Sequence, residues 1–326
     1  MSPSTTTAPL WQRLLLRRLK FLGWLLALLT VVLGGSYVFA PQWLVQANTA
    51  RQALAAHVEK RSVLAGDTTW SYYAGGDGPA IVLLHGFGTD KTVWLDVAGQ
   101  LTAHFHLVIP DLPGWGESSR GAAADYSIEA QAARLHTFVQ AIGVRDFVLV
   151  GHGTGAAVAA VYAAEYPQAV RELALLDAYG LQTTHSAFSD ATASRQLFVY
   201  DDRAGLARAN TLLYTRPPAL HGRLADVRIR RNQADRAFIE DALQRLRQPA
   251  QQLVVQERLA TLELPVLGLW CHADTVIDHS ALDSLRNGLT HAATISTSTV
   301  NGCKHLPMLE KPVETAQILT GFALSH

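Results

Sequence analysis

The sequence predicts an α/β fold built on a mostly parallel, doubly wound sheet, with a helical insertion and one long apolar segment ahead of it. Between residues 70 and 177, short runs rich in Val, Ile and Leu alternate with stretches of helical length. This alternation is typical of strand–helix–strand units, in which each crossover helix returns the chain to the same edge of the sheet. Functional residues of such sheets gather where the strands end.

The expected elements follow this alternation in order. They are a strand from Trp70, strands at 80–84, 106–109, 147–151 and 172–177, and helices at 93–102, 128–142 and 155–165. From 179 to 262 the alternation stops and only helical segments follow, which predicts a cap over the site. The core of the domain is therefore expected at 65–178 and 263–326, interrupted by the cap at 179–262.

A charge-free apolar segment, residues 21–40, precedes the globular part. A helix of about 20 residues spans roughly 30 Å, the thickness of the hydrocarbon layer of a bilayer, so the segment is predicted to be a transmembrane helix. Basic residues lie just before it and the next charge after it is Arg51, so the positive-inside rule places residues 1–20 in the cytoplasm. We therefore expect a single-pass protein of a bacterial inner membrane with a periplasmic globular domain.

The residues after this segment leave two alternatives open. Ala40 also suits the end of a signal peptide, although the following Pro41 favours a retained anchor. Residues 41–64 are predicted to form a juxtamembrane helix and linker, with the helix from Gln42 to Arg61, because apolar residues between Trp43 and Val58 recur at helical spacing. The apolar face of this helix could lie on lipid or pair with a second copy in a homodimer.

Composition limits the classes of function. The chain has 326 residues, 49% of them hydrophobic, which is enough for one large core. Its formal net charge of +0 argues against a nucleic-acid partner, which would require a basic excess. The histidines that follow predicted strands lack the spacing of a helical metal motif, so we expect neither metal nor cofactor. They are His85, His152, His272 and His305.

The most informative motif is Gly151-His-Gly153-Thr154-Gly155, which lies between an apolar run and an Ala-rich run. A strand, a glycine-bracketed turn and a helix form the setting of a Gly-x-Ser-x-Gly nucleophile elbow, but the central residue has no side chain. A phosphate-binding turn is the alternative, yet its glycines are spaced differently. Thr154 is not expected to replace the missing nucleophile, because it begins the helix and its side chain points elsewhere.

The other parts of a catalytic triad follow in the order that this kind of fold requires. Asp274 comes directly after an apolar strand, and His305 lies in a loop before the last helix, so they are expected to act as orienting acid and general base. Asp177, at the end of the preceding strand, is a rival for the acid. The backbone N–H groups of Phe87, in a His-Gly-Phe turn, and of Thr154 are expected to form an oxyanion hole.

These stretches resemble the α/β-hydrolase superfamily, and more closely its membrane-anchored monoacylglycerol lipases and the related bacterial anchored lipases and phospholipases A. This resemblance implies hydrolysis of lipid esters. The chain departs from the family pattern at Gly153, where the family carries serine, and at Lys304, where glycine is usual beside the histidine. The resemblance covers roughly residues 40–326 and lies in His85-Gly-Phe87, Trp94-Leu95, Val161-Tyr-Ala-Ala, Tyr166-Pro167, residues 226–229, Cys303-x-His305 and Glu310-x-Pro312.

Two further patterns have more than one interpretation. Cys271 and Cys303 are the only cysteines; we expect two buried free thiols, with a disulfide as the alternative in an oxidising compartment. The cap contains arginines such as Arg228, Arg230 and Arg231 and no lysine. These arginines are expected to form a solvated helical face, or else a rim that contacts anionic lipid headgroups above an apolar tunnel for acyl chains.

Three functions remain compatible with the missing serine. The chain could be an ester hydrolase altered at Gly153, a non-catalytic binder of acyl lipids, or a hydrolase in which His305 activates water. We favour the first: a membrane-anchored carboxylic-ester hydrolase lineage whose present form is inactive or severely impaired. Its expected partners are membrane lipid and an acyl ester, fatty acid or lysolipid.

Overall fold

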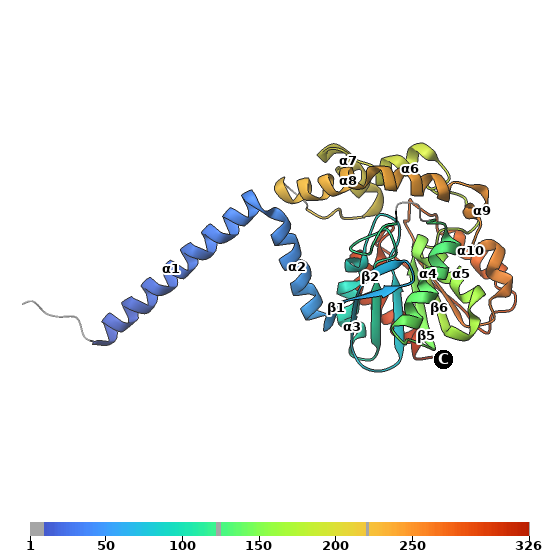
Figure 1. Ribbon diagram of the computed structural model, residues 1–326, viewed down its shortest axis with the longest axis horizontal. Helices are drawn as coiled ribbons and strands as arrows, with labels where there is room; N and C mark the ends of the chain where they lie inside the picture. The colour runs from blue at the N-terminus through green and yellow to red at the C-terminus, as the bar shows by residue number, and fades with distance from the viewer. Residues whose placement is uncertain (1–9, 122–124, 220–221, 326) are drawn as a thin grey trace, which may run out of the picture.

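The computed structural model describes residues 10–121, 125–219 and 222–325. Within them one sheet has the strand order β1-β2-β4-β3-β5-β6-β7-β8, in which β1 and β2 are antiparallel to their neighbours and the remaining pairs are parallel (Figure 1). The predicted fold class is confirmed. The strands are β1 Val58–Ala65, β2 Thr68–Gly75, β3 Ala80–Leu84, β4 His106–Pro110, β5 Phe147–His152, β6 Val170–Leu176, β7 Val266–Cys271 and β8 Ile295–Val300.

Helices cover both faces of this sheet. In the core, α4 packs beside α5, and α3 packs beside α12 (Figure 1). The helices of the described residues are α1 Leu10–Phe39, α2 Pro41–Ala55, α3 Leu95–Leu101, α4 Ile128–Ala141, α5 Thr154–Glu165, α6 Ala191–Phe198, α7 Arg203–Leu213, α8 Gly222–Leu246, α9 Pro249–Gln252, α10 Ala281–Gly288, α11 Pro307–Glu310 and α12 Pro312–Ala323. Short 3₁₀ turns lie at Lys91–Trp94, Pro167–Ala169 and Gln256–Thr261.

The centre of the sheet is fully packed where the site lies. All six residues of β5 are buried, and so are Thr154–Ala163 of the helix that follows. Parallel strands covered on both faces have continuous apolar sequences, which explains the unbroken Phe-Val-Leu-Val of β5. The turn from β5 to α5 is therefore held between two fully packed elements.

The amino-terminal apolar segment forms α1, which extends further than the predicted span of 21–40. It begins at Leu10 and therefore includes the basic residues that precede that span. By length and composition α1 could cross a membrane, and none of its residues is buried against the rest of the chain. The helix ends at Phe39, and Pro41 begins α2, where a proline is favourable because the first N–H of a helix has no partner.

The predicted helix from Gln42 to Arg61 is wrong beyond Ala55. His57 adopts φ 54°, and the chain then enters β1, which pairs residue by residue with β2. The helical spacing of apolar residues was real as far as α2, but pairing with a distant strand decides the conformation of the residues after it. The sheet therefore begins within the segment expected to be a linker.

The cap lies beside the end of the membrane-spanning candidate helix. Helices α6 to α9 stand between β6 and β7, above the edge of the sheet where the parallel strands end (Figure 1). The backbone N–H of Arg223, at the beginning of α8, donates to the hydroxyl of Tyr37 at 3.4 Å. This contact places the start of α8 next to the last turns of α1.

Candidate active site

The glycine-bracketed turn has the steric constraints that its sequence predicts. A Cβ added at Gly151 would lie 2.3 Å from the carbonyl oxygen of Gly155, and one added at Gly155 would lie 2.2 Å from that of His85. Both distances are far inside van der Waals contact, so only glycine fits. The strand and the helix can cross this closely because neither position carries a side chain.

Gly153 differs from these two glycines because it has room for a side chain. It adopts φ 55° and ψ −118° just before α5, a backbone conformation that costs a non-glycine residue about 1–3 kcal/mol. A Cβ there would meet only Gly86 Cα and His305 Nε2, each at 3.7 Å. A side chain at this position would therefore point at Nε2 of His305.

His305 and Asp274 lie together as the sequence predicts. His305 Nδ1 donates to Asp274 Oδ2 at 2.9 Å, and both side chains are buried. The other oxygen of Asp274 accepts the backbone N–H groups of Val276 at 2.7 Å and Ile277 at 3.2 Å. These bonds fix the carboxylate, which in turn fixes the imidazole with Nε2 facing Gly153.

Asp177, the rival acid, has a different set of contacts. It is fully buried, and its Oδ1 accepts the backbone N–H of Cys271 at 2.9 Å. Burial, and then the nearby charge of Asp274, raise the pKa of Asp177 well above its ordinary value. Among the described residues the acid that contacts His305 is Asp274, so the geometry separates the two candidates that the sequence left open.

The two cysteines form a disulfide, which corrects the expectation of free thiols. The Cα atoms of Cys271 and Cys303 are 5.4 Å apart, within the range that a bridge requires. Cys271 ends β7, three residues before Asp274, and Cys303 lies two residues before His305. The bridge therefore joins the two segments that carry the acid and the base, a closeness that sequence spacing could not establish.

Removing the disulfide should destabilise the domain. Replacing Cys271 and Cys303 together by alanine should lower the free energy of unfolding by about 2–4 kcal/mol, because the bridge closes a loop of 32 residues in the unfolded chain. Denaturant titration of the oxidised wild type, the reduced wild type and the double variant measures this loss. The reduced wild type should match the variant; equal stability of all three proteins would contradict a structural role of the bridge.

The expected oxyanion donors come from the turns that follow β3 and β5. Thr154 is the first residue of α5, so its N–H has no acceptor within the helix. No hydrogen bond within the described part of the chain uses the N–H of Phe87. The Phe87 ring contacts Trp115 from the core and Phe198 from the cap, with centroids 4.8 and 4.7 Å apart. Two backbone donors and an apolar aromatic cluster therefore lie at the same edge of the sheet.

Two buried histidines hold the turns of the site, a role that the sequence alone did not assign. His85 Nδ1 donates to the carbonyl of Gly86, while its Nε2 accepts the N–H of Leu112. His152 Nε2 donates to the backbone carbonyl of His305 at 2.6 Å. Burial lowers the pKa of both rings, so they serve as neutral hydrogen-bonding groups. No cluster of metal ligands occurs among the described residues.

A buried ion pair lies beneath the loop that follows β4. Lys91 Nζ lies 2.5 Å from Asp111 Oδ2 and 2.8 Å from Glu117 Oε2, and Asp111 is fully buried. Asp111 Oδ1 also accepts the backbone N–H of Lys91 at 2.8 Å. A Cβ at Gly116 would lie 2.1 Å from the Asp111 carboxyl carbon, which explains a glycine there. Opposite charges therefore stabilise the conformation of this loop.

Lys304 faces the cap rather than the imidazole beside it. Its ammonium donates to the carbonyl of Thr211 in α7, and its backbone N–H donates to Glu310 at 2.8 Å. The other Glu310 oxygen accepts the N–H of Thr215, and the N–H of His305 donates to Leu213. The loop that carries His305 is therefore tied to the end of α7.

Two of the cap arginines contact polar side chains elsewhere in the chain. Arg231 pairs with Asp90 at 3.1 Å and Arg228 donates to the hydroxyl of Tyr200 at 3.2 Å, whereas Arg230 is exposed. Arg230 and Arg231 are exposed, as both a solvated helical face and a lipid-binding rim require, whereas Arg228 is partly buried.

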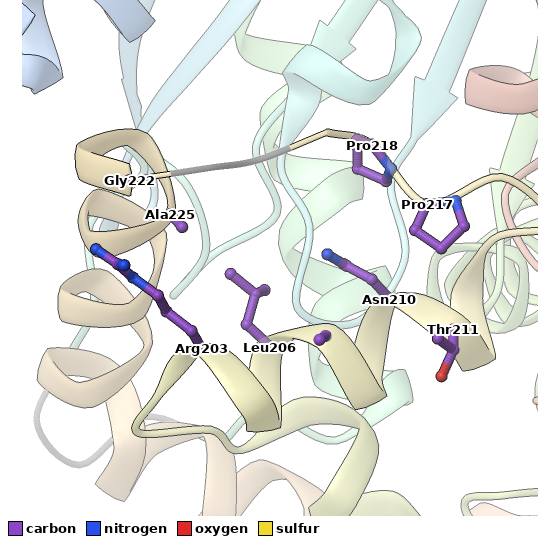
Figure 2. A pocket seen from close by; sticks show the side chains of 9 residues that line it. Arg203, Leu206, Asn210, Thr211, Pro217, Pro218, Gly222 and Ala225 are labelled. Atoms are coloured by element: carbon purple, nitrogen blue, oxygen red, sulfur yellow. The ribbon is translucent and has the colours of Figure 1, made fainter.

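A cavity of about 480 Å³ lies between α7 and α8 (Figure 2). Leu206, Ala225 and Pro217 supply apolar parts of its lining, and the Asn210 side chain points into the same space. Neither Gly153 nor His305 lines it. This cavity is therefore not the acyl tunnel expected between the cap and the strand ends.

The fold and this arrangement define the class of protein. Residues 79–312 match the family described by the alpha/beta hydrolase fold, and the chain belongs to that family. Among curated proteins it is 31% identical over 258 residues to Lipase 1 of Psychrobacter immobilis, covering 75% of this chain and 77% of that lipase. It is 30% identical over 266 residues to human monoacylglycerol lipase ABHD6, covering 77% of both chains.

The chain is also similar to the solved structure of a membrane phospholipase A, which is described as a novel bacterial virulence factor. It superposes with a TM-score of 0.81 at 32% sequence identity, covering 94% of this chain and 98% of the other. The predicted resemblance to anchored lipases and phospholipases is confirmed by these matches. The chain therefore stands in a lipase, esterase and phospholipase lineage of the fold.

Proposed function

We propose that the chain is a membrane-anchored carboxylic-ester hydrolase whose nucleophile position is occupied by Gly153, so that this form has lost most of its activity. One observation carries the proposal: a Cβ at Gly153 would lie 3.7 Å from His305 Nε2, while His305 Nδ1 is bonded to Asp274. This is the geometry of a base positioned to deprotonate a hydroxyl that the glycine lacks. Phe87 and Thr154 complete the proposed site through their backbone N–H groups.

The proposed chemistry explains what the glycine changes. With serine in place, His305 would take the Oγ proton as the oxygen attacks an ester carbonyl, and Asp274 would stabilise the imidazolium that forms. The N–H groups of Phe87 and Thr154 would stabilise the oxyanion. Loss of a triad nucleophile removes about six orders of magnitude in turnover and leaves roughly 10³–10⁴ over the reaction in water. Gly153 therefore predicts a severely impaired enzyme.

A second candidate function is binding of acyl lipids without turnover. The observation that favours it is that both proposed oxyanion donors are backbone groups, so the absence of a side chain at Gly153 leaves them in place. The aromatic cluster around Phe87 offers an apolar surface beside them. A fatty-acid carboxylate could bind these donors in the space that a serine hydroxymethyl group would fill.

Binding of a fatty-acid series tests this second candidate. Affinity for the glycine form should rise with chain length from about eight to eighteen carbons, by roughly 0.8 kcal/mol for each methylene that becomes buried, until the site is full. Titration calorimetry measures the series, and alkanols of equal length separate the contribution of the carboxylate. Affinities that do not change with length, or no binding, would leave the inactivated hydrolase as the better account.

We further propose that α1 is a retained anchor and that the globular domain lies outside the cytoplasm of a bacterial inner membrane. The length and apolar character of α1 and the basic residues near its start support this orientation. Carbonate-washed membranes should retain the protein, and protease added to spheroplasts should digest the domain. Protection of the domain in intact spheroplasts, with digestion only after lysis, would reverse the orientation.

Crosslinking in the same membranes tests the homodimer expected from α2.

A further inference from the structure

Two buried carboxyl groups meet beneath the proposed site. The backbone of Cys271 links Asp177, the residue after β6, to Asp274: its N–H donates to Asp177 Oδ1 at 2.9 Å and its carbonyl accepts the N–H of Asp274 at 3.1 Å. Neither side chain is exposed to solvent, and burial, together with interaction with Asp274, raises the pKa of Asp177. Two carboxylates in contact away from water repel each other strongly, so one of them takes up a proton. The proposed mechanism uses Asp274 and leaves Asp177 without a role.

The surrounding donors decide which of the two carries the proton. Asp274 accepts from the N–H groups of Val276 and Ile277 on Oδ1 and from His305 on Oδ2. Asp177 accepts one N–H, from Cys271 on Oδ1, and its Oδ2 has no donor among the described residues. Hydrogen-bond donors stabilise the ionised form of a carboxyl group, so the proton belongs on Asp177 Oδ2.

We propose that Asp177 is a positioning residue, which stays protonated at neutral pH and donates from its carboxyl group to Asp274. The carboxylate that orients His305 is then held by backbone, by imidazole and by Asp177. The other titratable groups near this pair are His305 itself and His152, whose ring centroid lies 4.7 Å from that of His305. Burial lowers the pKa of His152, so it adds no charge beside the pair. This inference rests on the proposed function in one respect, namely that Asp274 orients His305.

The backbone at Asp177 supplies a matched variant. This residue adopts φ 44°, in the left-handed region that asparagine and glycine tolerate best. In Asp177→Asn the amide oxygen can accept the N–H of Cys271 while the NH₂ donates to Asp274, with no ionisable group at the position. Asp177→Gly removes the donor without straining the backbone. The two variants therefore separate the hydrogen bond from the charge.

Infrared spectroscopy tests the protonation directly. The difference spectrum between wild type and Asp177→Asn, recorded at neutral pH in a detergent without ester groups, should contain the C=O stretch of a protonated carboxyl group in the wild type. That band should be absent from the variant. A difference spectrum with carboxylate bands alone would overturn the proposal.

NMR titration of the His305 ring tests the positioning role in the chain as it exists. Asp177→Asn should leave the pH of the His305 transition as in wild type, whereas removal of an ionised carboxylate would lower it by roughly 1–3 units. Asp177→Gly should raise the transition, because Asp274 loses a competing donor and attracts the imidazolium more strongly. A lowered transition in the asparagine variant, or an unchanged one in the glycine variant, would refute the positioning role.

Stability against pH gives a third, independent readout. Because the folded-state pKa of Asp177 is raised, its contribution to stability is complete below the unfolded value of about 3.9 and declines as pH rises toward the folded value. Asp177→Asn should therefore have a higher Tm than wild type at neutral pH, and the difference should shrink toward acidic pH. An equal Tm at every pH would contradict the proposal. None of these three tests needs enzymatic activity, so they stand even if serine at position 153 restores none.

Discussion

Gly153→Ser should create an active esterase from this chain, with hydrolysis of a short p-nitrophenyl ester rising by roughly several hundredfold or more over the glycine form. The physical reason is local: the new Cβ would lie 3.7 Å from His305 Nε2, so Oγ comes within reach of a base that Asp274 already orients. The expected gain is a conservative fraction of what a triad nucleophile contributes. Initial rates for the two purified proteins measure it.

Gly153→Ala is the matched control for this experiment, because it adds the same Cβ without a hydroxyl. Alanine should leave the rate at the level of glycine, and both variants should lose about 1–2 kcal/mol of stability through the positive φ at this residue. Adding His305→Ala to the serine variant should return the rate toward that of the glycine form. A folded serine variant without activity would refute the assigned triad, and an unchanged melting temperature would refute the predicted strain.

Lys91→Met should be the most destabilising of the charge substitutions proposed here, at about 3–5 kcal/mol. It removes the ammonium that lies 2.5 Å from Asp111 and leaves that fully buried carboxylate without its opposite charge. Methionine keeps most of the apolar stem of the lysine, so loss of packing contributes little. Chemical denaturation monitored by tryptophan fluorescence gives the difference in unfolding free energy.

Lys60→Met is the control, because Lys60 pairs with the same Glu117 at 3.2 Å, where both side chains are more than half exposed. Exposed pairs contribute about 0–1 kcal/mol, so a loss equal to that of Lys91→Met would show that burial does not decide the effect. Burial acts to raise the pKa of Glu117, but hydrogen bonds and charge from Lys91 and Lys60 outweigh it and lower the pKa to about 2.

The sign of the pH dependence follows from this lowered pKa. The stability that Glu117 contributes is present above its unfolded value of about 4.3 and is lost as pH falls toward 2. In Lys91→Met the pKa of Glu117 rises toward its unfolded value, so this acid loss should be smaller and should be complete at higher pH than in wild type. If the unfolding free energy fell identically with acid pH in both proteins, Lys91 would not stabilise the Glu117 carboxylate.

Local sequence was sufficient where a residue's role depends on its immediate neighbours. The close crossing of one strand and the next helix requires glycine at positions 151 and 155. The role of both residues could therefore be predicted without a structure. Asp274 and His305 each follow a strand of a parallel sheet, and such strand ends share one edge. The order of the motifs therefore predicted that these residues meet, and they do at 2.9 Å.

The sequence by itself determined the fold class, the long apolar helix and the composition of the site, because these depend on periodicity and on motifs only a few residues long. The tertiary structure alone decided contacts between distant segments: the pairing of β1 with β2, the Cys271–Cys303 bridge, and the choice of Asp274 over Asp177 beside His305. A residue's sequence neighbours do not report which distant backbone it will meet. For the same reason the sequence did not predict the pair of Lys91 and Asp111, which are twenty residues apart and whose opposite charges stabilise each other in the core.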